Sequence, residues 1–373
     1  MHVSISSLAQ KKPTIFLRWK IAGELPPVNN QRSLGFAGSI VGIHNNVLII
    51  GGGSNFPDSM PWFGGKKKYY DDLFVLKKQK DGTFKTYKIF KLPFPVAYAA
   101  CCSTPEGVVA VGGENEDGIS DKALLIKWDS VNQKPVFKDL PDFPFKVTNA
   151  SVAAHENTIY LAGGETGANV SRRFLSLRLT NTSAGWNELP DVPISFSHGV
   201  MLVQSDGTHN SVYLLGGRKK SKEKLSEFYC SVYKFSLGEN RWKKQTPMPY
   251  GLSAGTGVSA GRDQILVFGG DKGTTFHKTE SLMLAIAKEQ DPGKRKQLEE
   301  EKIRLQSSHP GFSKEVLLYN TITDKWTTCG FIPFDVPATT TAVKWKNTAI
   351  IPNGEIRAGV RTPKILEGEI EMK

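Results

Sequence analysis

The sequence predicts an all-β protein that folds as one six-bladed β-propeller. Two observations predict it: a short apolar run ending in a glycine doublet recurs along the chain, and four strand-like segments fit within each recurrence. Apolar residues make up 39% of the 373 residues and charged residues 23%, a globular balance that excludes wholesale disorder. No apolar stretch approaches the roughly 18 residues of a membrane-spanning helix, so we expect no membrane span.

The repeat is measured by the first glycine of each doublet. Five of these glycines follow one another at intervals of 60, 51, 53 and 53 residues: Gly52, Gly112, Gly163, Gly216 and Gly269. Each ends an apolar run such as Val108–Val111 or Ile265–Phe268. A sixth, diverged copy, Thr348–Ile351 followed by Pro352, Asn353 and Gly354, comes 84 residues after the fifth. Repeats of roughly 50 residues are typical of propeller blades.

Each unit has the same internal order, which predicts four strands. A strand of small residues comes first, as in Gly35–Val41 and Ala150–Ala154. The apolar strand with its doublet is second, and a third strand follows, as in Ala123–Trp128. A fourth often opens with Trp and ends in an apolar-Pro pair, as from Trp242 to Pro249. Glycine doublets suit places where the backbone needs positive φ or close approach.

The two chain ends predict how the ring closes. The segment from Arg18 to Pro26 looks like a fourth strand with no blade before it. Lys364–Ile370 looks like a third strand with no fourth strand after it. We therefore expect the N-terminal strand to complete the C-terminal blade, which would remove an exposed sheet edge.

The predicted organisation is a tail over residues 1–12 and a single propeller over residues 13–373. A charged, helix-biased insertion over residues 279–306 explains the long interval before the sixth unit; a plain helical cover over one blade is its simplest interpretation. The tail lacks the apolar region of a signal peptide, yet Ser7-Leu8-Ala9 before Gln10 resembles a cleavage site without its upstream half. The hypothesis is a secreted protein whose signal is shortened.

Charge and cysteine content narrow the classes of partner. A net charge of +12 favours anionic partners such as a small acidic substrate. No zinc-finger, helix-turn-helix or RNA-recognition signature accompanies the lysines, so nucleic acid is set aside. The four cysteines lack metal-ligand spacing, and neither a metal site nor another cofactor is predicted.

The residues that follow the doublets are the first candidates for a site, because loops after the second strands surround the mouth of a propeller. These residues are Ser54, Glu114, Glu165, Arg218, Asp271 and Glu355. Acidic residues also accept hydrogen bonds in turns, and that simpler interpretation stays open for each of them except Glu355.

Glu355 is distinct because its blade has lost the doublet. The segment Asn353–Thr362 places a carboxylate and an arginine six positions apart with Gly359 between them, which would let the loop fold back. Glu355 can shuttle a proton, and Arg361 offers a planar fork for a carboxylate. A plain salt bridge between the two explains the pair about as well.

The blades with Gly-Gly and Trp…Leu-Pro resemble kelch repeats. The segment Asn353-Gly354-Glu355…Gly359-Val360-Arg361-Thr362 resembles the signature loop of sialic acid mutarotases, also called N-acetylneuraminate epimerases. Gly35–Gly38 leading to Gly51–Gly53, and then Lys67–Leu76, are similar to a blade of that family. The resemblance covers essentially the whole chain in rotated order, like a cyclically permuted branch.

The resemblance implies an isomerase that converts the α-anomer of N-acetylneuraminate to the β-anomer without a cofactor, in the periplasm. By position, Glu355 would be the catalytic acid/base and Arg361 its partner. Asn353, Arg32 and His198 are proposed to bind the acidic sugar. The sequence predicts no oligomeric state.

The sequence leaves one other function open and argues against two more. A non-catalytic kelch propeller that binds a protein or an acidic sugar is the main alternative, and Phe56, Trp62 and Phe63 could serve it. A hydrolytic sialidase would need Ser-x-Asp-x-Gly-x-x-Trp repeats, and none occurs. A copper radical oxidase would need a Tyr–Cys pair with histidine ligands, which the seven scattered histidines do not suggest.

Overall fold

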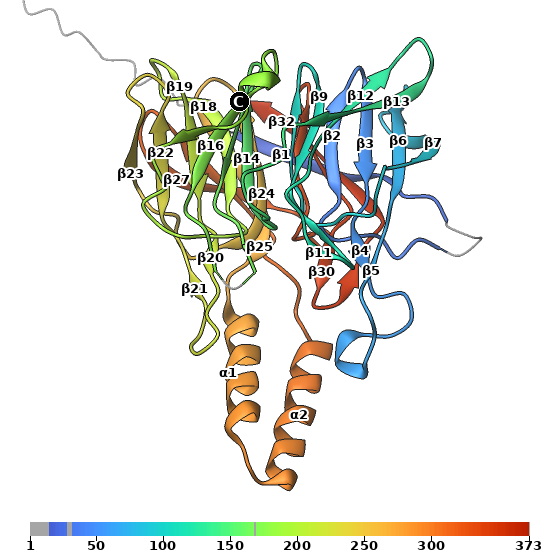
Figure 1. The fold of residues 1–373 in the computed structure, drawn as a ribbon, viewed down its shortest axis with the longest axis vertical. Coiled ribbons are helices and arrows are strands. Elements are labelled where there is room, and N and C mark those ends of the chain that lie inside the picture. Colours follow the sequence, from blue (N-terminus) through green and yellow to red (C-terminus); the bar gives the residue numbers. More distant parts are fainter. Residues whose placement is uncertain (1–14, 28–31, 168, 373) are drawn as a thin grey trace, which may run out of the picture.

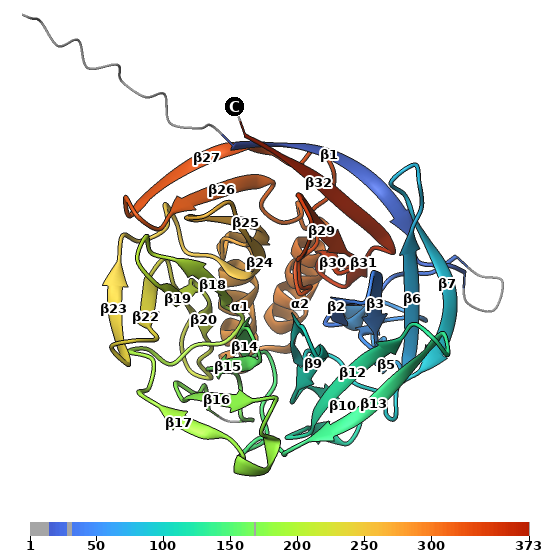
Figure 2. The same ribbon diagram turned by 90° about the horizontal axis from the view of Figure 1, so that it is seen from above.

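The computed structural model describes residues 15–27, 32–167 and 169–372, and these form six four-stranded antiparallel sheets arranged as a ring (Figure 2). The predicted six-bladed propeller is confirmed. The predicted N-terminal tail and its possible cleavage site lie outside the described residues.

Each blade runs from an inner strand at the central channel to an outer strand at the rim. In that order the strands are β2 (Ile40–His44), β3 (Val47–Gly51), β6 (Asp72–Lys78) and β7 (Phe84–Lys91) in blade 1; β8 (Ala100–Thr104), β9 (Gly107–Val111), β12 (Ala123–Asp129) and β13 (Lys134–Leu140) in blade 2; and β14 (Ser151–His155), β15 (Thr158–Ala162), β16 (Phe174–Arg178) and β17 (Asn187–Leu189) in blade 3.

The second half of the ring continues the pattern. Its strands are β18 (Val200–Ser205), β19 (Asn210–Leu215), β22 (Val232–Ser236) and β23 (Arg241–Gln245) in blade 4; β24 (Ser253–Ala260), β25 (Gln264–Asp271), β26 (Glu315–Asn320) and β27 (Lys325–Phe331) in blade 5; and β28 (Val343–Trp345), β29 (Thr348–Pro352), β32 (Lys364–Met372) and β1 (Ile15–Glu24) in blade 6. Short strand pairs and 3-10 turns extend from the blades: β4 (Ser54–Asn55) with β5 (Lys68–Tyr69), β10 (Glu114–Asn115) with β11 (Gly118–Ile119), β20 (Arg218–Lys219) with β21 (Glu227–Phe228), β30 (Glu355–Arg357) with β31 (Val360–Arg361), η1 (Pro61–Phe63) and η2 (Thr182–Ala184).

The ring closes as the sequence predicts. Strand β1 pairs antiparallel with β32 from Ile15 opposite Met372 to Glu24 opposite Lys364. The first and last segments of the chain therefore share one sheet, and β1 becomes the outer strand of blade 6.

The apolar core lies between the blades. Six clusters of buried side chains each join two neighbouring blades; one packs Ile49 and Val75 of blade 1 against Val108 and Ile126 of blade 2. The tryptophans that open fourth strands link blades at the rim, since Trp242 Nε1 donates to Pro190 O of the preceding blade at 2.8 Å.

Left-handed backbone explains the doublets. The first glycine of each doublet has φ between 63° and 69°, and Asn353 takes this position in blade 6 with φ 41°. Asparagine tolerates this conformation better than most residues. The diverged sixth copy therefore keeps the backbone geometry of the other five.

A ring of backbone hydrogen bonds surrounds the central channel at the end where the short strand pairs and the helical insertion extend. One residue per blade, just before or at the start of the inner strand, donates its N–H to the carbonyl oxygen of its counterpart in the preceding blade, at 2.7–3.2 Å. The ring residues all have positive φ, and they are Gly38, Tyr98, Asn149, His198, Ala254 and Thr339. The link from Gly38 N to Thr339 O completes the ring across blades 1 and 6.

The insertion is a helical hairpin. Helices α1 (Thr274–Lys288) and α2 (Pro292–Ser307) connect β25 to β26, and α1 begins ahead of the predicted start at residue 279. They project from the mouth face (Figure 1) and lie behind the centre of the ring in Figure 2. Neither helix has a buried residue. Among the described residues, no helix is long and apolar enough to span a bilayer.

Candidate functional site

The six residues after the doublets form a layer at the mouth of the propeller. Each forms an antiparallel bridge with the residue that precedes a ring residue, as Glu355 does with Ala338 and Arg218 does with Ser197. Backbone pairing thus fixes all six positions just above the hydrogen-bonded ring. The repeat therefore delivers six polar side chains, four of them carboxylic acids, to one face.

Glu355 stands at the base of the β30–β31 hairpin. Its Oε1 accepts the N–H of Gly359 at 2.9 Å and Nη1 of Arg361 at 3.3 Å. Gly359 has φ 71°, which allows the hairpin to fold back, as the sequence predicts. No hydrogen bond to Oε2 is observed from the described residues. One carboxylate oxygen is therefore held in place and the other is available.

Arg361 lies beside that carboxylate and beneath an aromatic wall. Its side chain is only 4% exposed, and its guanidinium lies 4.9 Å from the ring centre of Phe56. Its buried Nε has no partner among the described residues. A buried guanidinium with a donor unused and one carboxylate neighbour has capacity for a further acceptor.

The loop that contains η1 forms the wall next to this hairpin. A Cβ atom at Gly359 would approach Trp62 to 3.3 Å and the sulfur of Met60 to 3.0 Å, so the loop packs directly on the hairpin. Phe63 is 64% exposed. Phe56 and Trp62 thus face the Glu355 hairpin, whereas Phe63 faces solvent.

A second charged group lies on blades 3 and 4. Arg218 Nη2 is 3.4 Å from His198 Nε2, His198 Nδ1 is 2.9 Å from Ser197 Oγ, and Ser197 Oγ donates to Glu165 Oε1 at 3.0 Å. Because the serine proton points to Glu165, Nδ1 of His198 must donate to Ser197, and Nε2 accepts from Arg218. We call these four residues the relay.

Electrostatics keep the relay histidine neutral. Burial, together with nearby Arg218 and Lys220, holds the pKa of His198 well below its usual range. Burial also lowers the pKa of Arg218, while the carboxylates of Glu165, Asp271, Glu280 and Glu355 oppose that shift. The charges in the relay are therefore those of Glu165 and Arg218.

Blades 1 and 2 contribute a pair that is already satisfied. Glu114 Oε1 accepts from Lys67 Nζ at 3.1 Å and from the Tyr69 hydroxyl at 2.8 Å. Burial and this hydrogen bond raise the pKa of Tyr69 to about 12, so its hydroxyl stays a donor. For Glu114 the simpler interpretation, an acid that accepts local hydrogen bonds, describes the contacts well.

The helical insertion adds side chains that sequence reasoning missed. Phe276, in the first turn of α1, lies 4.7 Å from the guanidinium of Arg218. His309, just after α2, is buried; its Nδ1 accepts from Gly311 N, so the neutral ring carries its proton on Nε2. The signal available in the sequence was weak: an aromatic pair Phe276-His277 opening the insertion, and a His-Pro-Gly break closing it.

The structure brings some of the predicted site residues together and separates others. Glu355 and Arg361 are in contact, and His198 belongs to the relay across the mouth. Asn353 is fully buried, and its amide donates to Ser39 Oγ at 2.9 Å between blades 6 and 1. The side chain of Arg32 is 75% exposed and pairs with Glu24 at the end of β1.

The central channel below the ring holds a cavity of about 570 Å³. Its lining consists mostly of small inner-strand residues, and Lys344 is the charged residue among them apart from the titratable His198. Among the described residues, no carboxylate lines this cavity, whereas the carboxylates of Glu165 and Glu355 lie at the mouth.

The mouth offers a carboxylate with a free oxygen, an adjacent arginine and an aromatic wall. Such a set can move a proton and hold an anion at the same centre. Among residues 15–27, 32–167 and 169–372, no three His, Cys, Asp or Glu side chains gather as a metal site would require.

Comparison with known proteins identifies relatives. Residues 140–373 match the family model described as N-acetylneuraminate epimerase. N-acetylneuraminate epimerase of Haemophilus influenzae (strain 86-028NP) is 27% identical over 234 residues, covering 62% of this chain and 60% of that protein. The Salmonella typhimurium protein of the same name is 28% identical over 231 residues, covering 61% and 57%. The chain thus spans about 60% of the length of the curated relatives it matches.

A solved structure, that of YjhT, is similar over 95% of this chain and 100% of its own, with a TM-score of 0.62 and 15% sequence identity. This likeness shows a shared fold.

Proposed function

The chain belongs to the N-acetylneuraminate epimerase family, and we propose that it catalyses the conversion of α-N-acetylneuraminate to the β-anomer. The observation that carries the proposal is the Glu355 hairpin, in which one carboxylate oxygen is anchored by Gly359 and Arg361 while the other is available. That arrangement fixes the position of a proton-transfer group through one of its oxygens and leaves the other oxygen for the substrate.

The chemistry needs one bond broken and re-formed. Glu355 takes the proton of the anomeric hydroxyl as the bond from the anomeric carbon to the ring oxygen breaks. The hydroxyl oxygen becomes a ketone oxygen, and the proton passes to the ring oxygen. Rotation about one carbon–carbon bond presents the other ketone face, and the reverse proton transfers close the ring. Positioned acid/base catalysis of this kind contributes about 10²–10⁴-fold in rate.

Arg361 supplies the anion contact for this reaction. The sugar carboxylate is attached to the anomeric carbon, so its partner must lie next to the acid/base group. Arg361 Nη1 is 3.3 Å from Glu355 Oε1, and its Nε has no hydrogen-bond partner among the residues that the structure describes. The net charge of +12 draws an anionic sugar toward the mouth.

The test follows the anomers directly. A retaining sialidase releases α-N-acetylneuraminate, and proton NMR records its conversion to the β-anomer with and without the protein. We expect faster approach to the same equilibrium. An unchanged rate with folded protein at micromolar concentration would refute the proposed activity.

A binding propeller is the second candidate, and one observation favours it. The helical hairpin exposes Met283 at 56% and Phe63 beside the mouth is 64% exposed, which are surfaces that a protein partner could cover. This reading requires no turnover, so the NMR measurement also separates the two candidates.

We also propose residence in the periplasm, which the segment Ser7-Leu8-Ala9 supports by its resemblance to part of a cleavage site. N-terminal sequencing of the natively expressed protein tests it: a mature chain that starts at Gln10 is expected, and a retained Met1 contradicts export by cleavage.

A further inference from the structure

Among the described residues, the relay of Arg218, His198, Ser197 and Glu165 shares no hydrogen bond with Glu355. It spans blades 3 and 4, whereas the Glu355 hairpin belongs to blade 6. Glu355, Glu165 and Arg218 each form a backbone bridge with a residue that precedes a ring residue, so both groups lie at the same mouth. A ligand that is bound at Glu355 can therefore extend toward the relay.

The relay holds its two charged ends rigidly. Three consecutive hydrogen bonds connect Arg218 to Glu165 through His198 and Ser197, and Phe276 of α1 covers the guanidinium at 4.7 Å. The first turn of α1 is itself tied down, because Glu280 accepts from both the N–H and the hydroxyl of Ser226, at 2.9 and 2.6 Å. Both charged ends are thus positioned before any ligand arrives.

Each end keeps hydrogen-bonding capacity unused. Among the residues that the structure describes, the buried Nε of Arg218 has no partner, and its Nη2 contacts His198 and Glu165. Glu165 uses Oε1 for Ser197, and no partner of Oε2 is observed within the described part of the chain. The side chains of Glu165 and Arg218 are 20% and 16% exposed. Donor and acceptor groups thus stand side by side.

The charge balance selects the kind of ligand. Four carboxylates, those of Glu165, Asp271, Glu280 and Glu355, lie close enough to act on the charge of Arg218. Lys220 is the further cation close to His198. A second anionic group would meet this excess of negative charge, whereas a hydroxyl can donate to a carboxylate and accept from a guanidinium at once. The surroundings therefore favour neutral polyols over anions.

We propose that Glu165 and Arg218 form a subsite for vicinal hydroxyl groups, which binds the exocyclic polyol chain of the acidic sugar while Glu355 acts at the anomeric carbon. The inference rests on the proposed function for the identity of that sugar. It makes Glu165 and Arg218 specificity-determining residues, and it gives the α1 helix a role in the site through Phe276.

The test compares two sugars and two variants. One sugar is N-acetylneuraminate; the other is its seven-carbon analogue, made on a sialoside by periodate cleavage of the exocyclic chain and borohydride reduction, and then released by the sialidase. Glu165→Gln keeps the shape of the side chain but loses the charge, and Arg218→Lys loses the planar fork. For the nine-carbon sugar, each variant should lower kcat/KM by about 10- to 100-fold, chiefly through KM. For the shortened sugar, each should change it by less than about threefold.

Matched controls come from blade 4, the blade that also carries Arg218. Glu239→Gln and Arg241→Lys alter an exposed Glu–Arg pair at the rim, with 60% and 71% of each side chain exposed, and should change neither sugar's rate. Equal losses for both sugars in the relay variants, with unchanged thermal unfolding, would overturn the subsite. So would variants that keep the full preference for the longer chain.

Binding separates this proposal from the proposed function. Saturation-transfer NMR on the equilibrium mixture of N-acetylneuraminate should show its strongest signals on the exocyclic-chain protons, and these should weaken in Glu165→Gln. Binding with that pattern but without faster anomer conversion would refute the mutarotase and keep the subsite. Faster conversion with no change in the pattern would keep the mutarotase and refute the subsite. If the protein neither bound the sugar nor accelerated its conversion, both proposals would be overturned.

Discussion

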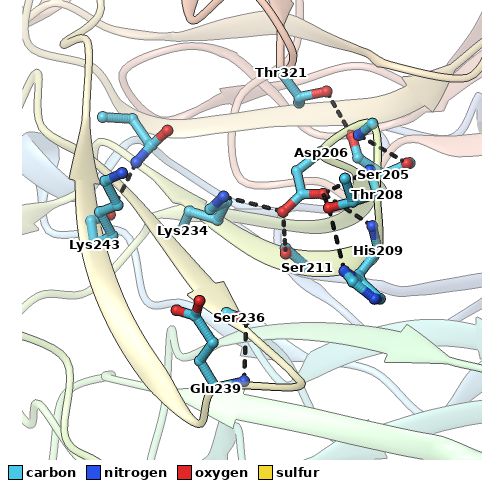
Figure 3. A network of polar contacts seen from close by, with 12 residues as sticks. Ser205, Asp206, Thr208, His209, Ser211, Lys234, Ser236, Glu239, Lys243 and Thr321 are labelled. Atoms are coloured by element: carbon cyan, nitrogen blue, oxygen red, sulfur yellow. Dashed lines mark hydrogen bonds and ion pairs between the residues drawn. The ribbon is translucent and has the colours of Figure 1, made fainter.

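Two charged clusters on opposite faces of the propeller use their carboxylates in different ways. On the face away from the mouth, Asp206 fills the turn between β18 and β19 (Figure 3). Its Oδ1 accepts from Thr208 N and Oγ1 and from His209 N, while Oδ2 accepts from Lys234 Nζ at 3.0 Å and Ser211 Oγ at 3.4 Å. At the mouth, Glu355 has both of its hydrogen bonds on Oε1.

The difference separates a carboxylate that braces a turn from one that is kept for a ligand. Five donors leave Asp206 no capacity for a further partner, and they stabilise its charged form. Glu355 Oε2 and Arg361 Nε accept or donate no hydrogen bond among the described residues, even though both side chains are largely buried. A buried polar atom without a hydrogen-bond partner lowers the stability of the fold. Such atoms are therefore expected mainly at functional sites, and the Nε atoms of Arg218 and Arg361 at the mouth are two of them.

The largest effect should come from Glu355→Gln. This variant keeps the acceptor oxygen for Gly359 and Arg361 but cannot take a proton, so the accelerated conversion should fall by about 10²–10⁴-fold. NMR of freshly released α-anomer measures the rate, and thermal unfolding should be almost unchanged. A variant with the wild-type rate would place the acid/base elsewhere.

A smaller loss is expected for Arg361→Lys. The ammonium keeps the charge but not the planar fork, so binding of the sugar carboxylate should weaken by about 10- to 100-fold, mostly as a higher KM. Initial rates at several sugar concentrations separate KM from kcat. If kcat alone falls, Arg361 acts by orienting Glu355 rather than by binding.

Asp206→Asn should affect stability rather than activity, unlike the Glu355 and Arg361 variants. Loss of the charged hydrogen bonds should reduce the free energy of unfolding by about 1.5–3 kcal/mol, with the anomer conversion rate unchanged. Urea unfolding gives the first quantity and NMR the second. A slower conversion in folded Asp206→Asn would remove the distinction between the two faces.

The contribution of Asp206 to stability should also depend on pH. Burial alone would raise the pKa of this carboxyl, but hydrogen bonds from His209, Thr208 and Lys234 outweigh it and bring the pKa well below its usual range. The unfolded chain, with an ordinary value of about 3.9, then binds a proton first as pH falls. The stability difference between wild type and Asp206→Asn should be constant above about pH 5 and shrink below about pH 4. A difference that grows on acidification would contradict this assignment.

The smallest change tests a residue that is close to the mouth without taking part in its chemistry. Ala254 has φ 56° in the hydrogen-bonded ring. Ala254→Gly should relieve that strain and raise the free energy of unfolding by up to about 1 kcal/mol, whereas Ala254→Val should lower it. Conversion rates should be unaffected. The two variants changing stability in the same direction would show that backbone strain does not set the effect.

The repeat made the fold predictable, because each doublet marks a backbone conformation that glycine adopts at low cost. Strand starts were less predictable: the segment from Gly35 enters β2 only at Ile40, since Gly38 first forms the ring with left-handed backbone. The start of α1 was missed because Thr274, Thr275 and Phe276 are poor helix formers.

The candidate site was predictable only where local sequence placed its residues together. Glu355 and Arg361 share one hairpin, so a short spacing revealed them. The relay joins Glu165 of blade 3 to Arg218 of blade 4, and the packing of these two blades brings them within 3.9 Å. Asn353 illustrates the reverse: its place in a suggestive segment reflects a left-handed backbone position rather than contact with the mouth.

The ring of backbone hydrogen bonds acts as a hoop that is mechanically independent of the seam between β1 and β32. None of its six links includes a residue of β1 or β32. Peeling the outer strand from the rim therefore leaves the hoop closed, and the layer of side chains mounted on it keeps its spacing. Fraying of the chain ends and opening of the mouth are thus separate events, because opening the mouth requires hydrogen bonds of the hoop to break.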